Sequence, residues 1–209
     1  MATVAVIGTG NMGRGLAKVL SEAGHTVILG SRNGERAEAV AREVGLGVVG
    51  RENAAAVRDA DVCFLAVPFA QENGTLHELR EHLAGKIVVD ISNPLNASYD
   101  GLVTEPTTSA AEWIAGMLPA SRVVGAFKNT LAAVFAQPVF EGEQSTVFVV
   151  GDDEEAKQYL LGIIRTLPFT GLDAGALSVA RTLENMSVLL IQLVQKHDYH
   201  WRAGFRVLA

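Results

Sequence analysis

The sequence has little cysteine and little charge. Its one cysteine, Cys63, excludes an intramolecular disulfide and a two-cysteine redox motif. It lies in the apolar run 62–67, so we expect a buried thiol. Charged residues make up 19% of the 209 residues, and the net charge of −6 argues against a general surface for nucleic acid or anionic membranes. Any phosphate-binding site must therefore be a local basic pocket.

Long hydrophobic runs are also missing. No stretch reaches the roughly 18 uncharged apolar residues that a membrane span needs. The first apolar segment begins by residue 3, which leaves no room for a signal peptide. We therefore expect a cytoplasmic protein without a membrane segment. Because 49% of the residues are apolar, a chain of this length can still bury one substantial core.

The usual groups of catalytic side chains are absent as well. No His, Cys and carboxylate residues cluster at metal-ligand spacing, and there is neither a Tyr-x-x-x-Lys pair nor a Gly-x-Ser-x-Gly elbow. We expect no metal and no catalytic side chain. When both reacting partners are cofactors, the chemistry is theirs and the protein orients them. Direct hydride transfer then requires two ring carbons held about 3–3.5 Å apart.

A glycine-rich turn near the start carries the most information. The apolar run 4–7 predicts a buried parallel strand, and the segment from Met12 to Ala23 has the spacing of an amphipathic helix. Between them, the three glycines allow a tight turn, close approach of a pyrophosphate and close helix packing. The pattern predicts a dinucleotide site, and a purely structural turn is the alternative. The predicted cofactor contacts here are Gly8, Thr9, Gly10, Asn11, Met12 and Gly13.

The end of the second predicted strand selects the nucleotide. An NAD site usually presents an acid to the ribose 2′-hydroxyl at this point, but the sequence reads Gly30-Ser31-Arg32. Arg36 lies one turn into the next helix, which Asn33 is placed to cap. We predict that Ser31, Arg32 and Arg36, together with Thr9, bind a 2′-phosphate, so the cofactor is NADP(H). Alternatively, Arg36 pairs with Glu35 or Glu38 on a solvated face.

Strand and helix patterns alternate almost to the end of the chain. This alternation predicts an α/β fold, a single Rossmann-type doubly wound, mainly parallel sheet. C-terminal strands and a long last helix, about 176–197, extend it. We expect one NADP-binding domain over 1–209, with a nucleotide-binding core of about 1–95 and a substrate-side extension of about 96–209. In the last helix, Leu183, Met186, Leu190 and Leu193 share a face that is either core or dimer seam.

Three further loops follow predicted strands at the edge where open α/β sheets bind ligands. At the end of the strand 61–67 we predict that Val67, Pro68 and Phe69 form a wall beside the nicotinamide ribose. The predicted cofactor contacts here are Ala66, Val67 and Pro68. After the strand 86–91, Asn93 and Pro94 either contact the cofactor or the substrate or form only a turn. The strand 122–127 precedes a polar cluster that either contacts substrate or caps the next helix. The predicted substrate-binding residues are Leu95, Lys128, Asn129 and Thr130.

The chain resembles the NADPH-dependent reductases of the deazaflavin coenzyme F-420. The resemblance spans nearly the whole length, and its most specific segments are 151–157 and 173–184. It implies that the 2′-phosphate is held by the residues named above and that the protein is a homodimer. Where relatives often read Ala-Phe-Asn-Thr, this chain has Lys128 inserted before Asn129 and Thr130. The other segments that carry the resemblance are 8–13, 30–32, 90–95 and 123–130.

The resemblance leads to a specific functional hypothesis. The protein is expected to be an NADP(H)-dependent oxidoreductase that transfers a hydride between NADPH and a small-molecule co-substrate, the deazaflavin coenzyme F-420 or a flavin. Two alternatives remain at this point. One is an NADPH-dependent reductase of a small imine or carbonyl compound, and the other is a protein that senses NADPH without turnover.

Overall fold

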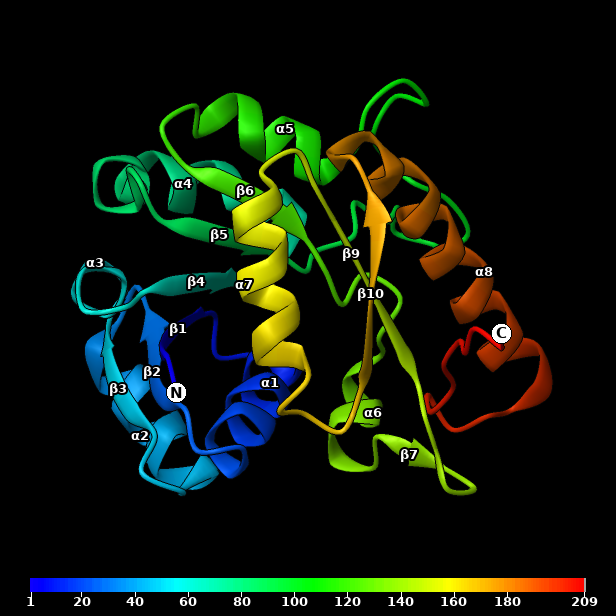
Figure 1. Ribbon diagram of the computed structural model, residues 1–209, viewed down its shortest axis with the longest axis horizontal. Coiled ribbons are helices and arrows are strands. Elements are labelled where there is room, and N and C mark those ends of the chain that lie inside the picture. Colours follow the sequence, from blue (N-terminus) through cyan, green and yellow to red (C-terminus); the bar gives the residue numbers. More distant parts are fainter. Residues whose placement is uncertain (209) are drawn as a thin grey trace.

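The predicted doubly wound sheet is confirmed by the computed structural model, which describes residues 1–208. Eight strands form the main sheet in the order β10-β9-β6-β5-β4-β1-β2-β3 (Figure 1). The six strands from β3 to β6 run parallel in the Rossmann order 3-2-1-4-5-6. The strands are β1 (Thr3–Ile7), β2 (Thr26–Ser31), β3 (Val49–Glu52), β4 (Val62–Leu65), β5 (Ile87–Asp90), β6 (Arg122–Gly125), β9 (Thr146–Gly151) and β10 (Thr170–Gly175).

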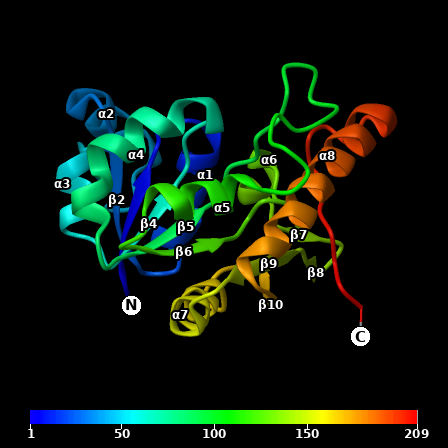
Figure 2. The ribbon, with the colours of Figure 1, turned by 90° about the horizontal axis from the view of Figure 1, so that it is seen from above.

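The C-terminal extension joins the same sheet with one change of direction. β9 pairs antiparallel with β6, and β10 pairs parallel with β9. A small hairpin, β7 (Val139–Phe140) and β8 (Glu143–Gln144), precedes β9. Its strands of two residues each are too short to give a periodic pattern, and the sequence does not predict them. Seen from above, the N-terminal strands and the last helix lie at opposite ends of the molecule (Figure 2).

Helices cover both faces of the sheet because side chains of a strand alternate between its faces. Val4 and Val6 of β1 belong to one core cluster, whereas Ala5 and Ile7 belong to the other. Helices α1, α2, α6 and α7 supply the first cluster, and α3, α4, α5 and the start of α8 supply the second. The helices are α1 (Asn11–Glu22), α2 (Gly34–Val44), α3 (Asn53–Arg58), α4 (Phe69–Leu83), α5 (Ala110–Met117), α6 (Ala132–Ala136), α7 (Glu154–Ile164) and α8 (Ala180–His197), with a 3-10 turn η1 (Leu177–Val179) before the last.

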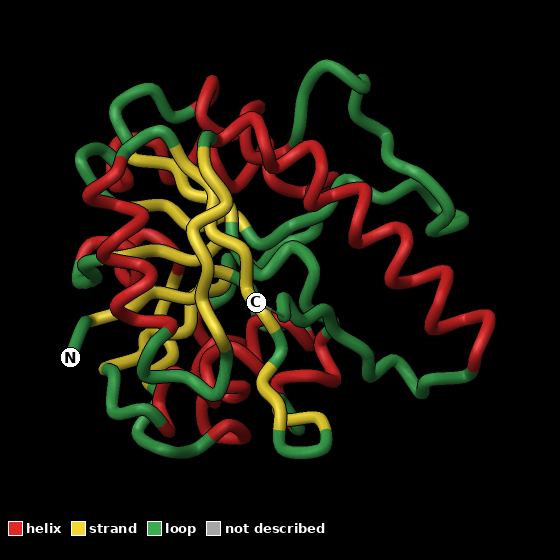
Figure 3. The backbone as a smooth tube through the Cα atoms, turned by 45° about the vertical axis from the view of Figure 1, so that its right-hand side comes forward, coloured by secondary structure: helices red, strands yellow, loops and turns green. Residues whose placement is uncertain are grey.

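The last helix begins against the sheet and then extends away from it (Figure 3). Leu183 and Leu190 are buried within the monomer, so this part of the apolar face is core. By length and composition alone, the segment Leu177–His197 is apolar enough to cross a membrane, but half of its most apolar window is buried inside the protein. The chain then returns to β9, where Thr146 N–H donates to the Phe205 carbonyl at 2.7 Å.

Two details of the core correct or confirm the sequence reading. Cys63 is fully buried, as predicted, and burial raises the pKa of its thiol to about 12. The strand predicted over 122–127 ends earlier, at Gly125. Phe127 then adopts a left-handed φ of 55° while its ring packs edge-on against Phe64 and Phe169. The chain therefore turns sharply before Lys128.

Candidate nucleotide site and the buried cluster behind it

The three glycines of the first turn meet different constraints. A Cβ atom on Gly8, whose φ is +128°, would lie 2.3 Å from the Ala66 carbonyl oxygen. One on Gly13 would lie 1.9 Å from the Gly8 carbonyl oxygen. One on Gly10 would meet no protein atom within 4 Å. Close packing of the backbone therefore explains why positions 8 and 13 are glycine. The space above Gly10 is open to a ligand.

The start of α1 suits an anion. Gly10 is the N-cap, and among the described residues no side chain caps the helix and no acid lies in its first turn. The first amides of a helix have no intrahelical partner, and the helix dipole makes this end positive. A phosphate above Gly10 would satisfy these donors. The geometry thus fits the pyrophosphate of a dinucleotide.

A basic corner forms where β2 ends. Asn33 caps α2, as predicted, because its side chain accepts a hydrogen bond from Arg36 N–H at 2.9 Å. Arg36 Nε in turn donates to Thr9 Oγ1 at 3.1 Å, which links α2 to the glycine turn. Arg32 and Arg36 are both exposed. Within residues 1–208, Arg36 makes no ion pair, so the alternative pairing with Glu35 or Glu38 is wrong.

The loops after β4 and β5 border the same edge. Ala66 N–H donates to the Ile7 carbonyl at 2.8 Å, which places the start of the 66–68 loop beside the glycine turn. Asn93 Nδ2 donates to the Lys128 carbonyl at 2.7 Å, while Asn93 Oδ1 is buried without a partner. Asn93 is therefore more than a turn residue, and one acceptor atom stays free. The contacts predicted for Val67, Pro68 and Pro94 with cofactor stay predictions.

The polar cluster after β6 points into the protein. Asn129 Nδ2 donates to the Thr146 carbonyl at 3.0 Å, and Thr130 is also buried. The N-cap of α6 is Leu131, with no side-chain hydrogen bond. The idea that Asn129 or Thr130 caps this helix is therefore wrong. Substrate contacts by these two residues, and by the half-buried Leu95, stay predictions.

Lys128 lies at the centre of a buried charged cluster. Its side chain is fully buried, and Nζ donates to Asp90 Oδ2 at 2.6 Å, the Ser92 carbonyl at 2.7 Å and Glu184 Oε1 at 2.9 Å. Burial alone would lower the pKa of Lys128, but the combined effect of the Asp90 and Glu184 carboxylates outweighs burial and raises it. The three N–H groups of the ammonium are thus all used inside the protein. This burial argues against the direct substrate contact predicted for Lys128.

A third carboxyl group, that of Glu72, lies next to this cluster. Glu72 belongs to the first turn of α4 and is fully buried. Burial, followed by the charge of Asp90, raises its pKa to about 8. Burial also raises the pKa of Glu184, although Lys128 opposes the shift.

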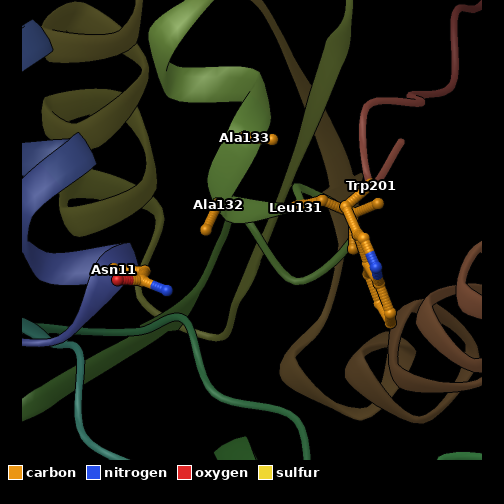
Figure 4. Close-up of a pocket in the computed structure, with 5 residues that line it drawn as sticks. All are labelled: Asn11, Leu131, Ala132, Ala133 and Trp201. Carbon is orange, nitrogen blue, oxygen red and sulfur yellow. The ribbon is translucent and has the colours of Figure 1, made fainter. Parts of the chain in front are cut away.

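A pocket opens where α1 begins, beside α6. Its volume is ≈ 410 Å³. Asn11 of the glycine turn lies on one side, and the half-exposed ring of Trp201 lies on the other (Figure 4). Small and apolar side chains line the remainder, which suits a flat organic ring better than a highly charged group. The lining residues are Asn11, Leu131, Ala132, Ala133 and Trp201.

The geometry agrees with what known proteins reveal. The family model described as NADP oxidoreductase, coenzyme F420-dependent, matches residues 3–94. Over 204 residues the chain is 33% identical to the F420-dependent NADP reductase of Methanocaldococcus jannaschii, and the alignment covers 91% of each protein. The chain belongs to the family of F420-dependent NADP oxidoreductases. It is therefore an NADP-dependent oxidoreductase, as the sequence predicts.

Two other relatives bear on the fold and its variation. A crystal structure described as a candidate F420-dependent NADP reductase from Arthrobacter sp. FB24 superposes with a TM-score of 0.90, at 28% identity and over 100% of both chains. Metalloreductase STEAP3 of Rattus norvegicus is 34% identical over 188 residues, which are 90% of this chain but 37% of that relative. This family of NADP oxidoreductases thus shares its fold with one part of a larger protein.

Sequence reasoning missed four residues at this edge: Glu72, Asp90, Glu184 and Trp201. A signal existed for the carboxylates. Glu72 falls on the buried face of α4 with Leu76, Leu79 and Leu83, and Glu184 falls on the buried face of α8 beside Leu183. Asp90 ends an otherwise apolar strand. Trp201 gave no signal, because it reaches the pocket only through the return of the chain after α8.

Proposed function

We propose that this oxidoreductase transfers a hydride between NADPH and the deazaflavin coenzyme F-420. The observation that carries the proposal is the basic corner next to an open glycine turn, in a chain that matches an F420-dependent NADP reductase along nearly its full length. When bound, NADP(H) and the deazaflavin would supply the hydride chemistry, and the residues of the chain would hold the two rings. No side chain need act as acid or base for this step.

The residues of the chain bind and orient the nucleotide in this proposal. The amides at Asn11 and Met12 face the pyrophosphate above Gly10, and Thr9, Ser31, Arg32 and Arg36 hold the 2′-phosphate. Ala66, Val67, Pro68, Asn93 and Pro94 border the nicotinamide end. The pocket between Asn11 and Trp201 offers apolar side chains against which the acceptor ring can pack. Leu95, Asn129 and Thr130 stay proposed substrate contacts near this end.

One assay tests the proposal against its alternatives. Purified protein is mixed with NADPH and, in separate reactions, with coenzyme F-420, FMN, FAD or a panel of imines, and the NADPH absorbance is followed. Fast oxidation with the deazaflavin alone supports the proposal. Oxidation with FMN or FAD instead identifies a flavin acceptor, and oxidation with imines overturns the cofactor-to-cofactor mechanism. Tight NADPH binding without oxidation by any acceptor leaves a sensing role.

The assembly and location of the protein belong to the same proposal. We propose a homodimer in the cytoplasm, organised as one NADP-binding domain over 1–209. Helix α8 supports the dimer, because it extends away from the sheet (Figure 3) and carries the exposed apolar side chain of Leu189. Sedimentation equilibrium measures the mass directly. A monomer mass at micromolar concentration would contradict this part of the proposal.

A further inference from the structure

The buried cluster at the end of β5 and β6 holds more carboxyl groups than one ammonium can neutralise. Asp90, Glu184 and Glu72 are each fully buried, and Lys128 is the cation that faces them. The three N–H groups of Lys128 are already taken by Asp90 Oδ2, Glu184 Oε1 and the Ser92 carbonyl. No donor of Lys128 is left for Glu72.

The three carboxyl groups differ in what else stabilises a negative charge on them. Asp90 Oδ1 accepts a hydrogen bond from Ser92 N–H at 2.8 Å. Glu184 accepts one from Ala110 N–H at 3.0 Å, at the positive end of α5. Neither oxygen of Glu72 has a hydrogen-bond partner among the described residues. Because an unpaired buried charge is the most costly arrangement, the extra proton belongs on Glu72.

A neutral Glu72 has a partner within reach. The Ser92 hydroxyl lies beside its carboxyl group, and Ser92 Oγ is itself buried without a partner. A protonated Glu72 can donate to Ser92 Oγ or accept from it, whereas an ionised Glu72 can only accept from the Ser92 hydroxyl. Glu72 and Ser92 therefore place the first turn of α4 beside the loop after β5. These are the two segments that border the proposed nicotinamide end.

We propose that Glu72 is a positioning residue that works as a neutral carboxylic acid, holding the loops 66–68 and 92–94 together around the nicotinamide end of NADPH. This inference rests on the proposed NADPH site. Ionisation of Glu72 adds a second uncompensated negative charge next to Asp90 and Glu184. Repulsion from Asp90, at the end of β5, then pushes the first turn of α4 away from the 92–94 loop, and the nicotinamide end loses its wall.

The charged groups around Glu72 are few and defined. Asp90 comes from β5, Lys128 follows β6, and Glu184 comes from α8. Helix α5, which packs against α4, carries Glu112, but this carboxylate is paired with Arg181 of α8 at 2.5–2.8 Å. Helix α3 also packs against α4 and ends at the exposed Arg58. Burial also raises the pKa of Glu184, so a change in nucleotide binding near pH 8 is assigned to Glu72 by its loss in Glu72→Gln.

Binding measurements across pH test this role. The dissociation constants of NADPH and of 2′,5′-ADP are measured by calorimetry between about pH 6.5 and about pH 9.5 for the parent protein, Glu72→Gln and Glu78→Gln. The last variant is the matched control, because Glu78 is an exposed residue of the same helix. The amide of Glu72→Gln keeps the shape and the donor but does not ionise.

We expect NADPH to bind the parent protein and the control about fivefold or more weakly above pH 8 than below it, a typical size for coupling between sites. Glu72→Gln should keep its affinity over the same range. 2′,5′-ADP, which lacks the nicotinamide end, should show no difference among the three proteins. Equal pH profiles of NADPH for the parent protein and Glu72→Gln would overturn the proposal.

A spectroscopic measurement keeps the test valid if Glu72→Gln does not fold. The infrared carbonyl band of a protonated carboxylic acid is followed in the unmodified protein as the pH is raised. The band should disappear with a midpoint near pH 8, and its absence at neutral pH contradicts a neutral Glu72. Neither experiment includes the deazaflavin, so failure of the proposed hydride transfer is detected separately from failure of this inference.

Discussion

Two polar centres at the same edge of the sheet are built in opposite ways. The corner of Thr9, Ser31, Arg32 and Arg36 has exposed cations, and within the described residues Arg36 contacts the hydroxyl of Thr9 rather than an acid. The cluster around Lys128 is fully buried, and the donors of that lysine are all used by the protein. Charge that is exposed and unneutralised is available to a ligand, whereas charge that is buried and paired maintains the fold.

This difference separates residues that bind the nucleotide from residues that stabilise the fold. An exposed cation reduces the stability of the folded protein very little, because water solvates it when no phosphate is bound. A buried pair gains little net energy over an apolar pair, but it becomes very costly when one partner is removed. Mutations in the two centres should therefore affect different measurements, and each of the following predictions uses that contrast.

The largest effect is expected on stability. Lys128→Met removes the cation and leaves the buried carboxylates of Asp90 and Glu184 without it, so the free energy of unfolding should fall by about 3–5 kcal/mol. Arg32→Met removes an exposed cation and should change it by less than about 0.5 kcal/mol. Urea unfolding of both variants measures the two values. Similar small losses would show that the Lys128 cluster does not support the fold.

The next effect is expected on nucleotide choice. Arg32→Ala removes a charged partner of the 2′-phosphate, worth about 1.5–3 kcal/mol, so NADPH should bind roughly 10- to 100-fold more weakly. NADH has no such phosphate, and its affinity should barely change. Arg42→Ala, at the far end of the same helix α2, is the control. Equal losses for NADPH and NADH would contradict the phosphate assignment.

The contrast also explains which parts of the structure can be predicted from the sequence alone. The glycine turn, the missing acid after β2 and the alternation of elements have short-range causes, namely backbone sterics and side-chain periodicity, so they predict the Rossmann core and the basic corner. The antiparallel pairing of β9 with β6 depends on contacts between segments far apart in the chain, and no local pattern encodes it.

The buried cluster was misjudged for the same reason. Lys128 in a polar tripeptide after a strand looks like an exposed residue, and only its partners Asp90, 38 positions away, and Glu184, 56 positions away, reveal its burial. Glu72 and Glu184 do carry a local signal, since each interrupts the apolar face of a helix. A carboxylate at such a position indicates a buried partner elsewhere, but the spacing does not identify it.

Within the glycine turn, the same contrast distinguishes two neighbouring positions. Gly13→Ala places a methyl group 1.9 Å from the Gly8 carbonyl oxygen, and overpacking of this kind costs about 1–3 kcal/mol of stability. Gly10→Ala meets no protein atom within 4 Å, so stability should hardly change while NADPH affinity falls. Thermal unfolding and NADPH titration separate the two. Unchanged NADPH affinity of Gly10→Ala would contradict the position proposed for the pyrophosphate.

For each unit of pH, the smallest effect is the pH dependence of stability that Glu72 causes. Its pKa is about 8 in the folded protein and about 4.3 when unfolded, so between these values the folded state holds a proton that the unfolded state has lost. Stability from this proton is complete below about pH 4.3 and decreases as the pH rises toward 8, by at most about 1.4 kcal/mol per pH unit. Urea unfolding at a series of pH values compares the parent protein with Glu72→Gln, whose side chain does not titrate. With rising pH, the free energy of unfolding of the parent protein should fall steadily relative to that of Glu72→Gln. The exposed arginine corner contributes no such slope, so Arg32→Met should follow the parent protein at every pH. A difference that is constant from pH 5 to pH 8 would show that Glu72 is ionised in the folded protein and that its charge is neutralised by the cluster.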